Sequence, residues 1–176
     1  RLDMAITAEK VVRPKWMRVK LGQFVEQAQA ALSVLKRISS NLRPATLDTL
    51  GLIATIRWYL NQFSQSTGIG TTLQLPEYVR LSDISSIAVF RVIQEALTNI
   101  HRHSESSAAT VTLKRQDGIL QLEVADEGRG LPPELIANID ELGAFGVGLA
   151  GMKERVESLG GTLRIESGSG GTRLTA

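Results

Sequence analysis

The stretch from residue 109 to residue 126, ATVTLKRQDGILQLEVAD, constrains the fold of this chain more than any other segment. Apolar and polar residues alternate on both sides of its central Asp-Gly pair, which is the typical sequence of a two-residue β-hairpin turn. Because side chains alternate between the two faces of a strand, one face of the second strand is apolar. That face carries Leu120, Leu122 and Val124. The sequence therefore predicts an antiparallel hairpin with one face turned to a core.

Helical segments precede and follow the hairpin. The capping residues and breakers predict three helices, at residues 46–66, at 82–103 with Ser82 as N-cap, and at 148–159 with Gly160 as stop signal. Apolar positions of the last two helices are expected at Ile84, Ile87, Ala88, Leu149, Met152, Val156 and Leu159. Short strands are expected at GTTLQLP and within GTLRIESGSGGTRLTA. Runs of helix and antiparallel strand in this order predict an α+β fold.

The sequence pattern changes from helical to mixed helix and strand near residue 68, where we place a domain boundary. Before it, apolar residues from Leu21 to Leu42 recur in steps of three and four, which is the heptad pattern of a helix packed along another helix. A single amphipathic helix on a globular core is the alternative. Residues 1–67 therefore read as helical hairpin material, interrupted or kinked at Pro44, and residues 68–176 as a separate domain.

Composition narrows the classes of function. The chain of 176 residues carries a formal net charge of +2, so no strong field indicates nucleic acid or a membrane surface as partner. The absence of cysteine excludes disulfides and thiolate metal sites, and it is compatible with the cytoplasm. No apolar run approaches the roughly 20 residues that span a bilayer, so we expect this segment to make no membrane contact.

One face of the helix FRVIQEALTNIHRHS carries polar side chains at a spacing of four, those of Glu95, Asn99 and His103. The amide oxygen of Asn99 suits a hard cation such as Mg²⁺ when phosphates supply most of the charge. Glu95 could act as a general base or hold a water. The alternative is a solvated polar helix face.

Asp126 ends the second hairpin strand on the same side as the apolar residues of that strand. A carboxylate that faces the core needs hydrogen-bond donors, and an exocyclic amine such as that of adenine would serve. Gly128 and Gly130 would let a ligand approach the backbone. An aspartate-capped turn, DEGRG, is the alternative.

A second glycine cluster, GVGLAGM, opens the last helix. Helix N-termini bind phosphate well, because their N–H groups are free. The cluster does not follow a strand and lacks the lysine of a P-loop, so a Rossmann or P-loop site is excluded.

Taken in order, these features resemble the ATP-binding domain shared by sensor histidine kinases, gyrase, MutL and the heat-shock chaperone. QEALTNIHRHS looks like the asparagine box, DEGRG like the first glycine box and GVGLAGM like the second. NLRPATLDTLGL resembles the second dimerisation helix of histidine kinases of the nitrate-sensor type, and GMKERVESLGGTLRIES is similar to the same subfamily. The resemblance implies partial dimerisation and phosphotransfer helices in residues 1–67. It implies an α/β sandwich of the Bergerat type, with a mixed, largely antiparallel sheet, in residues 68–176.

The resemblance also implies roles for individual residues. Asn99 would bind Mg²⁺, Glu95 would be the catalytic base or orienting group, and Asp126 would bind the adenine amine. Arg102 and His103 would lie near phosphate, and Thr172 near the floor of the pocket. The remaining ATP-binding residues would be Gly128, Gly130, Gly146, Gly148 and Leu149. The two glycine clusters would be the hinges of a short ATP lid.

The function implied is the ATP-binding catalytic core of a two-component sensor histidine kinase, with ATP and Mg²⁺ as cofactors. Such kinases transfer the γ-phosphoryl group of ATP to a histidine and then to an aspartate in the receiver domain of a response regulator. The acceptor pair HD or HE is absent here, so we expect the acceptor histidine upstream of Arg1 and no autophosphorylation by these 176 residues alone. The resemblance further implies a homodimer through the N-terminal helices and a cytoplasmic location.

Other functions remain open at this point. An ATPase or conformational switch of the gyrase or chaperone type would use Glu95 to activate water. A kinase related to anti-sigma factors usually lacks the helical hairpin. A coiled-coil adaptor with an inactive nucleotide domain would not need Asn99 and Asp126.

Overall fold

The computed structural model describes residues 45–132 and 146–176. The chain divides into two compact units, Arg1–Leu42 and Arg43–Ala176, and every described residue belongs to the second. The predicted heptad pattern from Leu21 to Leu42, Pro44 and most of the predicted lid lie outside the described residues. Among the helices described, none is both long and apolar enough to cross a membrane.

The second unit is built on a five-stranded sheet with the strand order β1-β2-β3-β5-β4. Its strands are β1 Gly70–Gln74, β2 Ala108–Gln116, β3 Ile119–Asp126, β4 Arg164–Gly168 and β5 Gly171–Thr175. Strands β1 and β2 pair in parallel and the other neighbours pair antiparallel. The predicted α+β class and the mixed, largely antiparallel sheet are therefore confirmed.

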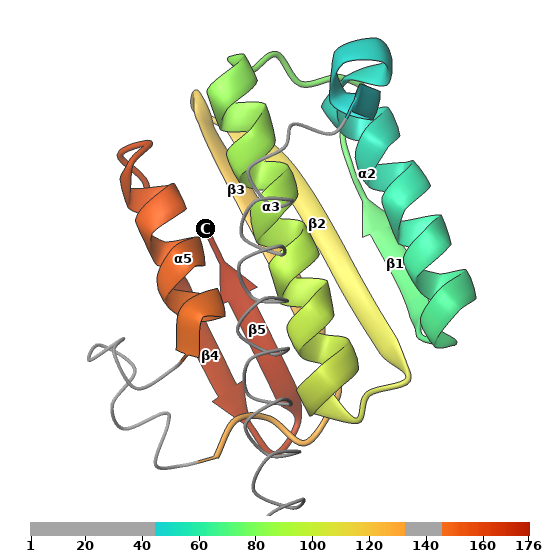
Figure 1. Ribbon diagram of the computed structural model, residues 1–176. Coiled ribbons are helices and arrows are strands. Elements are labelled where there is room, and N and C mark those ends of the chain that lie inside the picture. The colour runs from blue at the N-terminus through green and yellow to red at the C-terminus, as the bar shows by residue number, and fades with distance from the viewer. Residues whose placement is uncertain (1–44, 133–145) are drawn as a thin grey trace, which may run out of the picture. The chain divides into compact units, whose positions relative to one another are not determined.

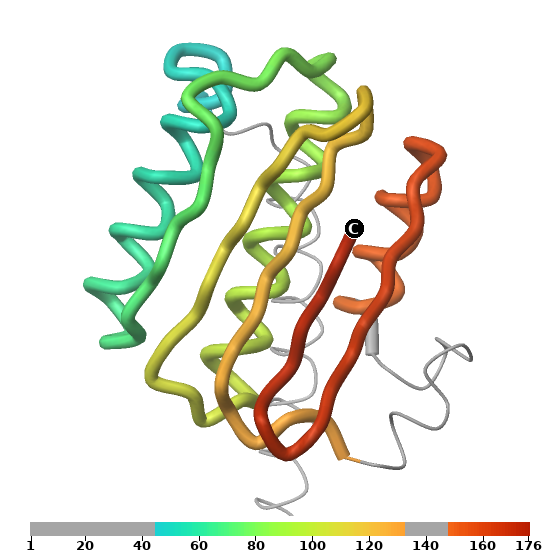
Figure 2. The backbone as a smooth tube through the Cα atoms, turned by 180° about the vertical axis from the view of Figure 1, so that it is seen from behind, coloured from blue at the N-terminus to red at the C-terminus, as the bar shows by residue number. Residues whose placement is uncertain are grey.

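Three of the described helices lie on one face of this sheet (Figure 1). They are α2 Ala45–Thr67, α3 Asp83–Asn99 and α5 Gly146–Glu157, and α3 continues into a π-helical turn, η1, from Ile100 to Ser104. Figure 2 shows the opposite face of the sheet, which none of the described helices covers.

Local signals account for where these elements begin and end. The Ser82 hydroxyl accepts a hydrogen bond from the Ser85 N–H at 3.1 Å, which confirms the predicted N-cap of α3. Helix α2 ends before Gly68, whose φ of +76° suits the left-handed residue that follows a helix. The hairpin turn places Asp117 and Gly118 at φ +53° and +82°, the geometry of the predicted two-residue turn.

The core lies between the helices and the sheet. Phe90, Ile93 and Leu97 of α3 are at most 1% exposed. The helices on either side and the hairpin contribute Ile56, Leu60, Val111, Leu113, Leu122, Val124 and Met152. Fully burying one such side chain contributes about 1.5–3 kcal/mol, so this layer fixes the helices against the sheet.

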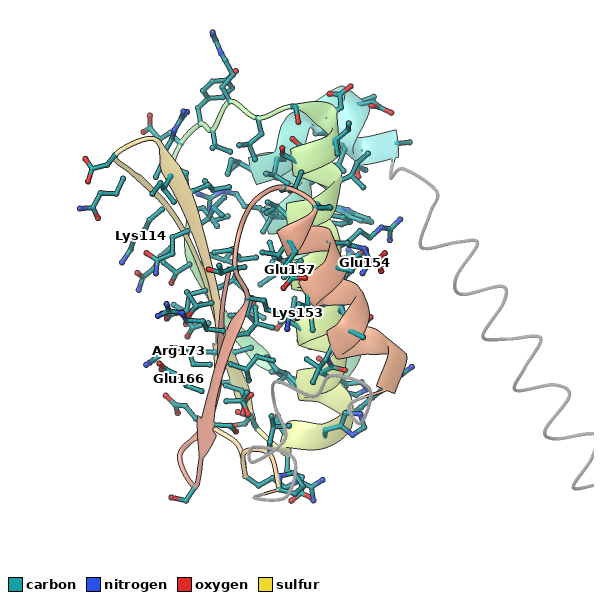
Figure 3. The ribbon with its side chains drawn as sticks, turned by 90° about the vertical axis from the view of Figure 1, so that its left-hand side faces the viewer. Lys114, Lys153, Glu154, Glu157, Glu166 and Arg173 are labelled. Atoms are coloured by element: carbon teal, nitrogen blue, oxygen red, sulfur yellow. The ribbon has the colours of Figure 1, made fainter. Side chains whose placement is uncertain are left out.

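The uncovered face of the sheet carries several charged side chains. Lys114, Glu166 and Arg173 project from it on the side away from the helices, as Figure 3 shows. The Arg173 Nε atom lies 3.5 Å from the Glu123 Oε1 atom on the neighbouring strand. Exposed ion pairs of this kind contribute little to stability. The charged side chains on this face are therefore best described as solvated.

Two details differ from the expectation, and a third falls where no prediction was made. Ile84, predicted among the apolar positions of its helix, is 72% exposed because it lies in the first turn of α3. Leu159 is 42% exposed because α5 ends at Glu157, two residues earlier than expected. Within the described residues the kink of α2 falls at Gly51, where φ is +76° and ψ is 174°.

Candidate functional site

Helix α3 presents the polar stripe that its sequence predicts. Glu95 and Asn99 are half-buried and His103 is exposed, while Leu97 and Ile100 on the other side enter the core. Directly after Asn99 the helix widens into η1, and the Ile100 N–H is shared between the carbonyl oxygens of Ala96 and Leu97. Single π-helical turns of this kind are frequent at functional sites.

Strand β3 delivers Asp126 to the helix side of the sheet. Asp126 is only 9% exposed, and its Oδ1 atom accepts a hydrogen bond from the Gly128 N–H at 2.8 Å. The aspartate-capped turn considered above is therefore present. The bond uses one carboxylate oxygen and leaves the other available for a further donor.

Thr172 lies close to this carboxylate. Strands β3 and β5 run antiparallel, and Leu174 pairs with Val124. Thr172, two residues before Leu174, and Asp126, two residues after Val124, therefore lie toward the same end of the sheet. Both side chains therefore lie on the helix side. A hollow of about 300 Å³ lies at this end of the sheet, and its lining includes Asp126 and Thr172 but also Ala125, and Glu166 and Arg173 of the uncovered face.

The first glycine segment packs against the end of the helix. A Cβ atom at Gly128 would collide with the Ser104 carbonyl oxygen and would lie 2.8 Å from Asp126 Oδ1. The Arg129 N–H donates to the same Ser104 oxygen at 2.9 Å. Gly130 has a φ of +73°, and a Cβ atom there would collide with the Gly168 carbonyl oxygen. This segment therefore tolerates no side chain at either glycine.

The second glycine segment approaches the same helix one turn before Asn99. A Cβ atom at Gly148 would collide with Glu95 Oε1. Gly146 is the first residue of α5, and Leu149 packs against the core. Arg102 and His103 are exposed on η1, and the Arg129 Nε atom donates to the His103 carbonyl oxygen at 2.8 Å.

The start of α5 and the segment that follows β3 thus lie beside the C-terminal end of α3 and η1 (Figure 1). Gly148 contacts Glu95 one turn before Asn99, and Gly128 contacts Ser104 one turn after it. The hollow at Asp126 and Thr172 is not lined by Glu95 or Asn99. A larger cavity of about 460 Å³ lies elsewhere, between the first half of α2 and the residues that lead into α3, and none of the predicted site residues lines it.

Ser167 belongs to this arrangement and was missed by the sequence analysis. Its hydroxyl lies 2.8 Å from the Thr172 Oγ1 atom and accepts a hydrogen bond from the Leu131 N–H at 2.8 Å. Ser167 thereby connects Leu131, the residue after Gly130, to the end of the sheet by a hydrogen bond. Its position two residues after Ile165 on β4 was the available signal, because residues at that spacing share a strand face.

Charges near Glu95 come from two helices. Burial lowers the pKa of Arg91, one turn before Glu95, and the positive charge of Arg155 on α5 lowers it further. The Arg155 Nη1 atom would lie 3.0 Å from a Cβ atom placed at Gly151, so this guanidinium folds back along α5 toward α3.

Comparison with known proteins identifies the family of this domain. The family model described as "Histidine kinase-, DNA gyrase B-, and HSP90-like ATPase" matches residues 84–176, more than half of the chain. The signal transduction histidine-protein kinase/phosphatase UhpB of Salmonella typhimurium is 39% identical over 157 residues, 88% of this chain and 30% of that protein. The sensor histidine kinase MctS of Rhizobium johnstonii is 35% identical over 153 residues, 86% of this chain and 32% of that protein. This chain spans about a third of the length of such relatives.

Solved structures show the same fold. The histidine kinase domain of the blue-light activated kinase EL346 of Erythrobacter litoralis superposes with a TM-score of 0.60 at 23% identity, over 70% of this chain and 58% of that one. The histidine kinase AdeS of Acinetobacter baumannii gives a TM-score of 0.61 at 15% identity, over 94% of this chain and 85% of that one. The resemblance found in the sequence is confirmed, and ATP is supported as the ligand of this domain. The chain belongs to the family of histidine kinase-, DNA gyrase B- and HSP90-like ATPases.

Proposed function

We propose that this chain is the ATP-binding catalytic core of a two-component sensor histidine kinase. The observation that carries the proposal is the approach of the two glycine segments to one continuous helix, at Glu95 of α3 and at Ser104 of η1, with Asp126 at the end of β3. The family match and the names of the relatives, which are sensor histidine kinases, support it.

Asp126 would bind the adenine. Its carboxylate keeps one oxygen for the Gly128 N–H and offers the other to the exocyclic amine of the base. A hydrogen bond to a charged group contributes about 1.5–3 kcal/mol, and leaving a buried group without its partner costs a similar amount. Gly128 and Gly130 would let the base lie against the backbone, and Thr172 would lie at the floor.

Asn99 and Glu95 would act at the phosphate end. The Asn99 amide oxygen would bind Mg²⁺ together with phosphate oxygens. Glu95 would orient or deprotonate the attacking group. Arg102 and His103 on η1 would lie near the phosphates, and Gly146 and Gly148, with Leu149, would form the second wall at the start of α5.

Catalysis in this reading is mainly positioning and charge neutralisation. The phosphoryl acceptor would be a histidine outside these 176 residues, since His101 and His103 both belong to the nucleotide helix. The phosphohistidine would then pass its phosphoryl group to an aspartate in a receiver domain. Residues 1–67 would supply dimerisation and phosphotransfer helices, and the homodimer would work in the cytoplasm.

Calorimetry with two nucleotides tests the proposal. The chain should bind ATP in the presence of Mg²⁺ and should bind GTP at least tenfold more weakly, because guanine presents a carbonyl oxygen where adenine presents its amine. Equal affinity for ATP and GTP would overturn the assignment of Asp126.

Phosphate release separates the kinase from the gyrase or chaperone type of ATPase. A kinase core without its acceptor should release inorganic phosphate from ATP no faster than the Glu95→Ala variant does. Steady phosphate release that requires Glu95 would favour the ATPase alternative instead.

A further inference from the structure

Arg129, in the first glycine segment, contacts the end of the helix that carries the site. Its backbone N–H donates to the Ser104 carbonyl oxygen at 2.9 Å. Its side chain reaches one residue further back, where the Nε atom donates to the His103 carbonyl oxygen at 2.8 Å. Its Nη1 atom lies 2.9 Å from Glu105 Oε1. One residue of the glycine segment therefore contacts three consecutive residues where η1 ends.

The end of a helix needs such donors. The last carbonyl oxygens of a helix have no N–H partner within it, and a positive charge is favourable there because the helix dipole is negative at that end. The turn η1 ends at Ser104, and Glu105, the next residue, has a left-handed φ of +58°. Arg129 supplies a donor to the carbonyl groups of the last two residues of η1. It is thus a helix cap that comes from a distant segment of the chain.

The hydrogen bond from the Nε atom is the side-chain contact that matters. The side chains of Arg129 and Glu105 are 60% and 73% exposed, and an ion pair so exposed contributes little. The Nε bond, by contrast, joins the side chain to the backbone of His103. A further link lies nearby, because the Glu127 N–H donates to the Ser106 hydroxyl at 3.3 Å. The segment after β3 and the end of η1 are therefore held together over several residues.

The two segments that Arg129 joins have different parts in the proposed site. Asp126, three residues before it, would bind the adenine, and Arg102 and His103 on η1 would lie near the phosphates. The turn η1 is π-helical, and such turns are rare, so its position depends on contacts with other segments. Arg129 supplies two of these contacts.

We propose that Arg129 is a positioning residue for the phosphate side of the site. Through the hydrogen bond of its Nε atom it holds the turn that carries Arg102 and His103, and it fixes this turn relative to the segment that would bind the adenine. This role requires no contact between Arg129 and the nucleotide. The inference rests on the proposed function, since it requires that Arg102 and His103 lie near phosphate.

Two substitutions of similar length test this role. In Arg129→Gln the amide Nε2 atom takes the place of the arginine Nε atom and can still donate to the His103 carbonyl oxygen, but the charge is lost. In Arg129→Met a methyl group takes that place, so both the donor and the charge are lost. The matched control is Arg115→Met, at an exposed residue beside the hairpin turn, which lies at the other end of the hairpin from Asp126.

The readout is the ratio of the affinities for ATP and for adenosine, both measured in Mg²⁺ with the 176-residue chain. Calorimetry gives the affinity for ATP, and NMR titration gives that for adenosine. Because the two ligands differ only in the phosphates, the ratio isolates the phosphate contribution. A purely structural role of Arg129 would lower the unfolding temperature and change both affinities by the same factor.

Arg129→Met should reduce this ratio about three- to tenfold, the range expected for one hydrogen bond. Arg129→Gln and Arg115→Met should keep the ratio of the parent. The His103 ring provides a second readout that needs no nucleotide, since the chain has only two histidines and their ring signals are easily followed by NMR. The His103 signal should move more in Arg129→Met than in Arg129→Gln.

Two results would overturn the role of Arg129. One is a ratio in Arg129→Met equal to that of the parent. The other is an equal reduction in Arg129→Gln, because the effect would then come from the charge of Arg129 and not from its hydrogen bond. A parent chain that binds no ATP would overturn the proposed function itself, while the His103 signal would still report whether Arg129 holds η1, so the two failures can be told apart.

Discussion

Replacing Gly128 by alanine tests the contact between the first glycine segment and the end of α3. The new methyl group would collide with the Ser104 carbonyl oxygen and lie 2.8 Å from both the Ser104 carbonyl carbon and Asp126 Oδ1. The two backbone segments must then separate, which breaks the 2.9 Å hydrogen bond from the Arg129 N–H to Ser104. Overpacking costs about 1–3 kcal/mol, and the lost hydrogen bond costs about 0.5–1.5 kcal/mol more. We therefore expect a loss of about 1.5–4.5 kcal/mol in the free energy of unfolding.

The assay is urea unfolding followed by circular dichroism, with Gly70→Ala as the matched control. Gly70 is exposed, and a Cβ atom there would lie 3.6 Å from the Ser107 carbonyl oxygen, an ordinary contact. The control should change the free energy of unfolding by less than about 0.5 kcal/mol. Equal stability of the two variants would refute the close contact at Gly128.

Three further perturbations address the rest of the site. Gly148→Ala should push the Glu95 carboxylate aside and weaken ATP binding, measured by calorimetry, about tenfold. The unfolding temperature should not fall, because the displaced atom is the end of a flexible side chain. A fall would show that the new methyl group disturbs more than the Glu95 carboxylate. Asn99→Ala should abolish most of the strengthening of ATP binding by Mg²⁺, and a variant that magnesium helps as much as the parent would exclude Asn99 as a ligand. Burial raises the pKa of Tyr59, so the folded chain keeps the phenol proton to higher pH than the unfolded chain does, and stability should be lost as the pH rises above 10.0. When unfolding is measured between pH 9 and 11, about one unit on each side of the ordinary value, this loss should be smaller in Tyr59→Phe than in Tyr78→Phe. Equal losses in the two variants would contradict the prediction.

Much of the fold could be predicted because local signals determine it. The Asp117-Gly118 turn needs only two adjacent residues with positive φ, and the cap of α3 needs only Ser82 and the N–H three residues later. Apolar periodicity failed at Ile84 and Leu159 because it does not fix where a helix begins or ends: Ile84 lies in the first turn of α3, and Leu159 lies beyond the end of α5. The kink at Gly51 has a φ of +76°, which glycine adopts readily, and the sequence analysis did not single out this residue.

Some features of the candidate site could likewise be predicted from local signals, and others could not. The sequence predicted that Asp126 would face the helix side, because strand alternation alone decides that point. It did not predict that Gly128 packs against Ser104 or that Ser167 joins Leu131 to Thr172. Those contacts join segments that are distant along the chain, and only the assembled sheet and helices bring them together.

Two neighbouring carboxylates allow the most direct test of the central claim, that Asp126 binds the adenine amine. Asp126→Asn keeps an oxygen for the Gly128 N–H but presents an amide donor where the second carboxylate oxygen was. The control is Glu127→Gln, which removes the same charge one residue further on, at an exposed position. Calorimetry with ATP and Mg²⁺ should show affinity about 10- to 150-fold weaker for Asp126→Asn, corresponding to about 1.5–3 kcal/mol, and near that of the parent for Glu127→Gln. If both variants bind ATP as tightly as the parent, adenine does not rest on Asp126 and the account is wrong.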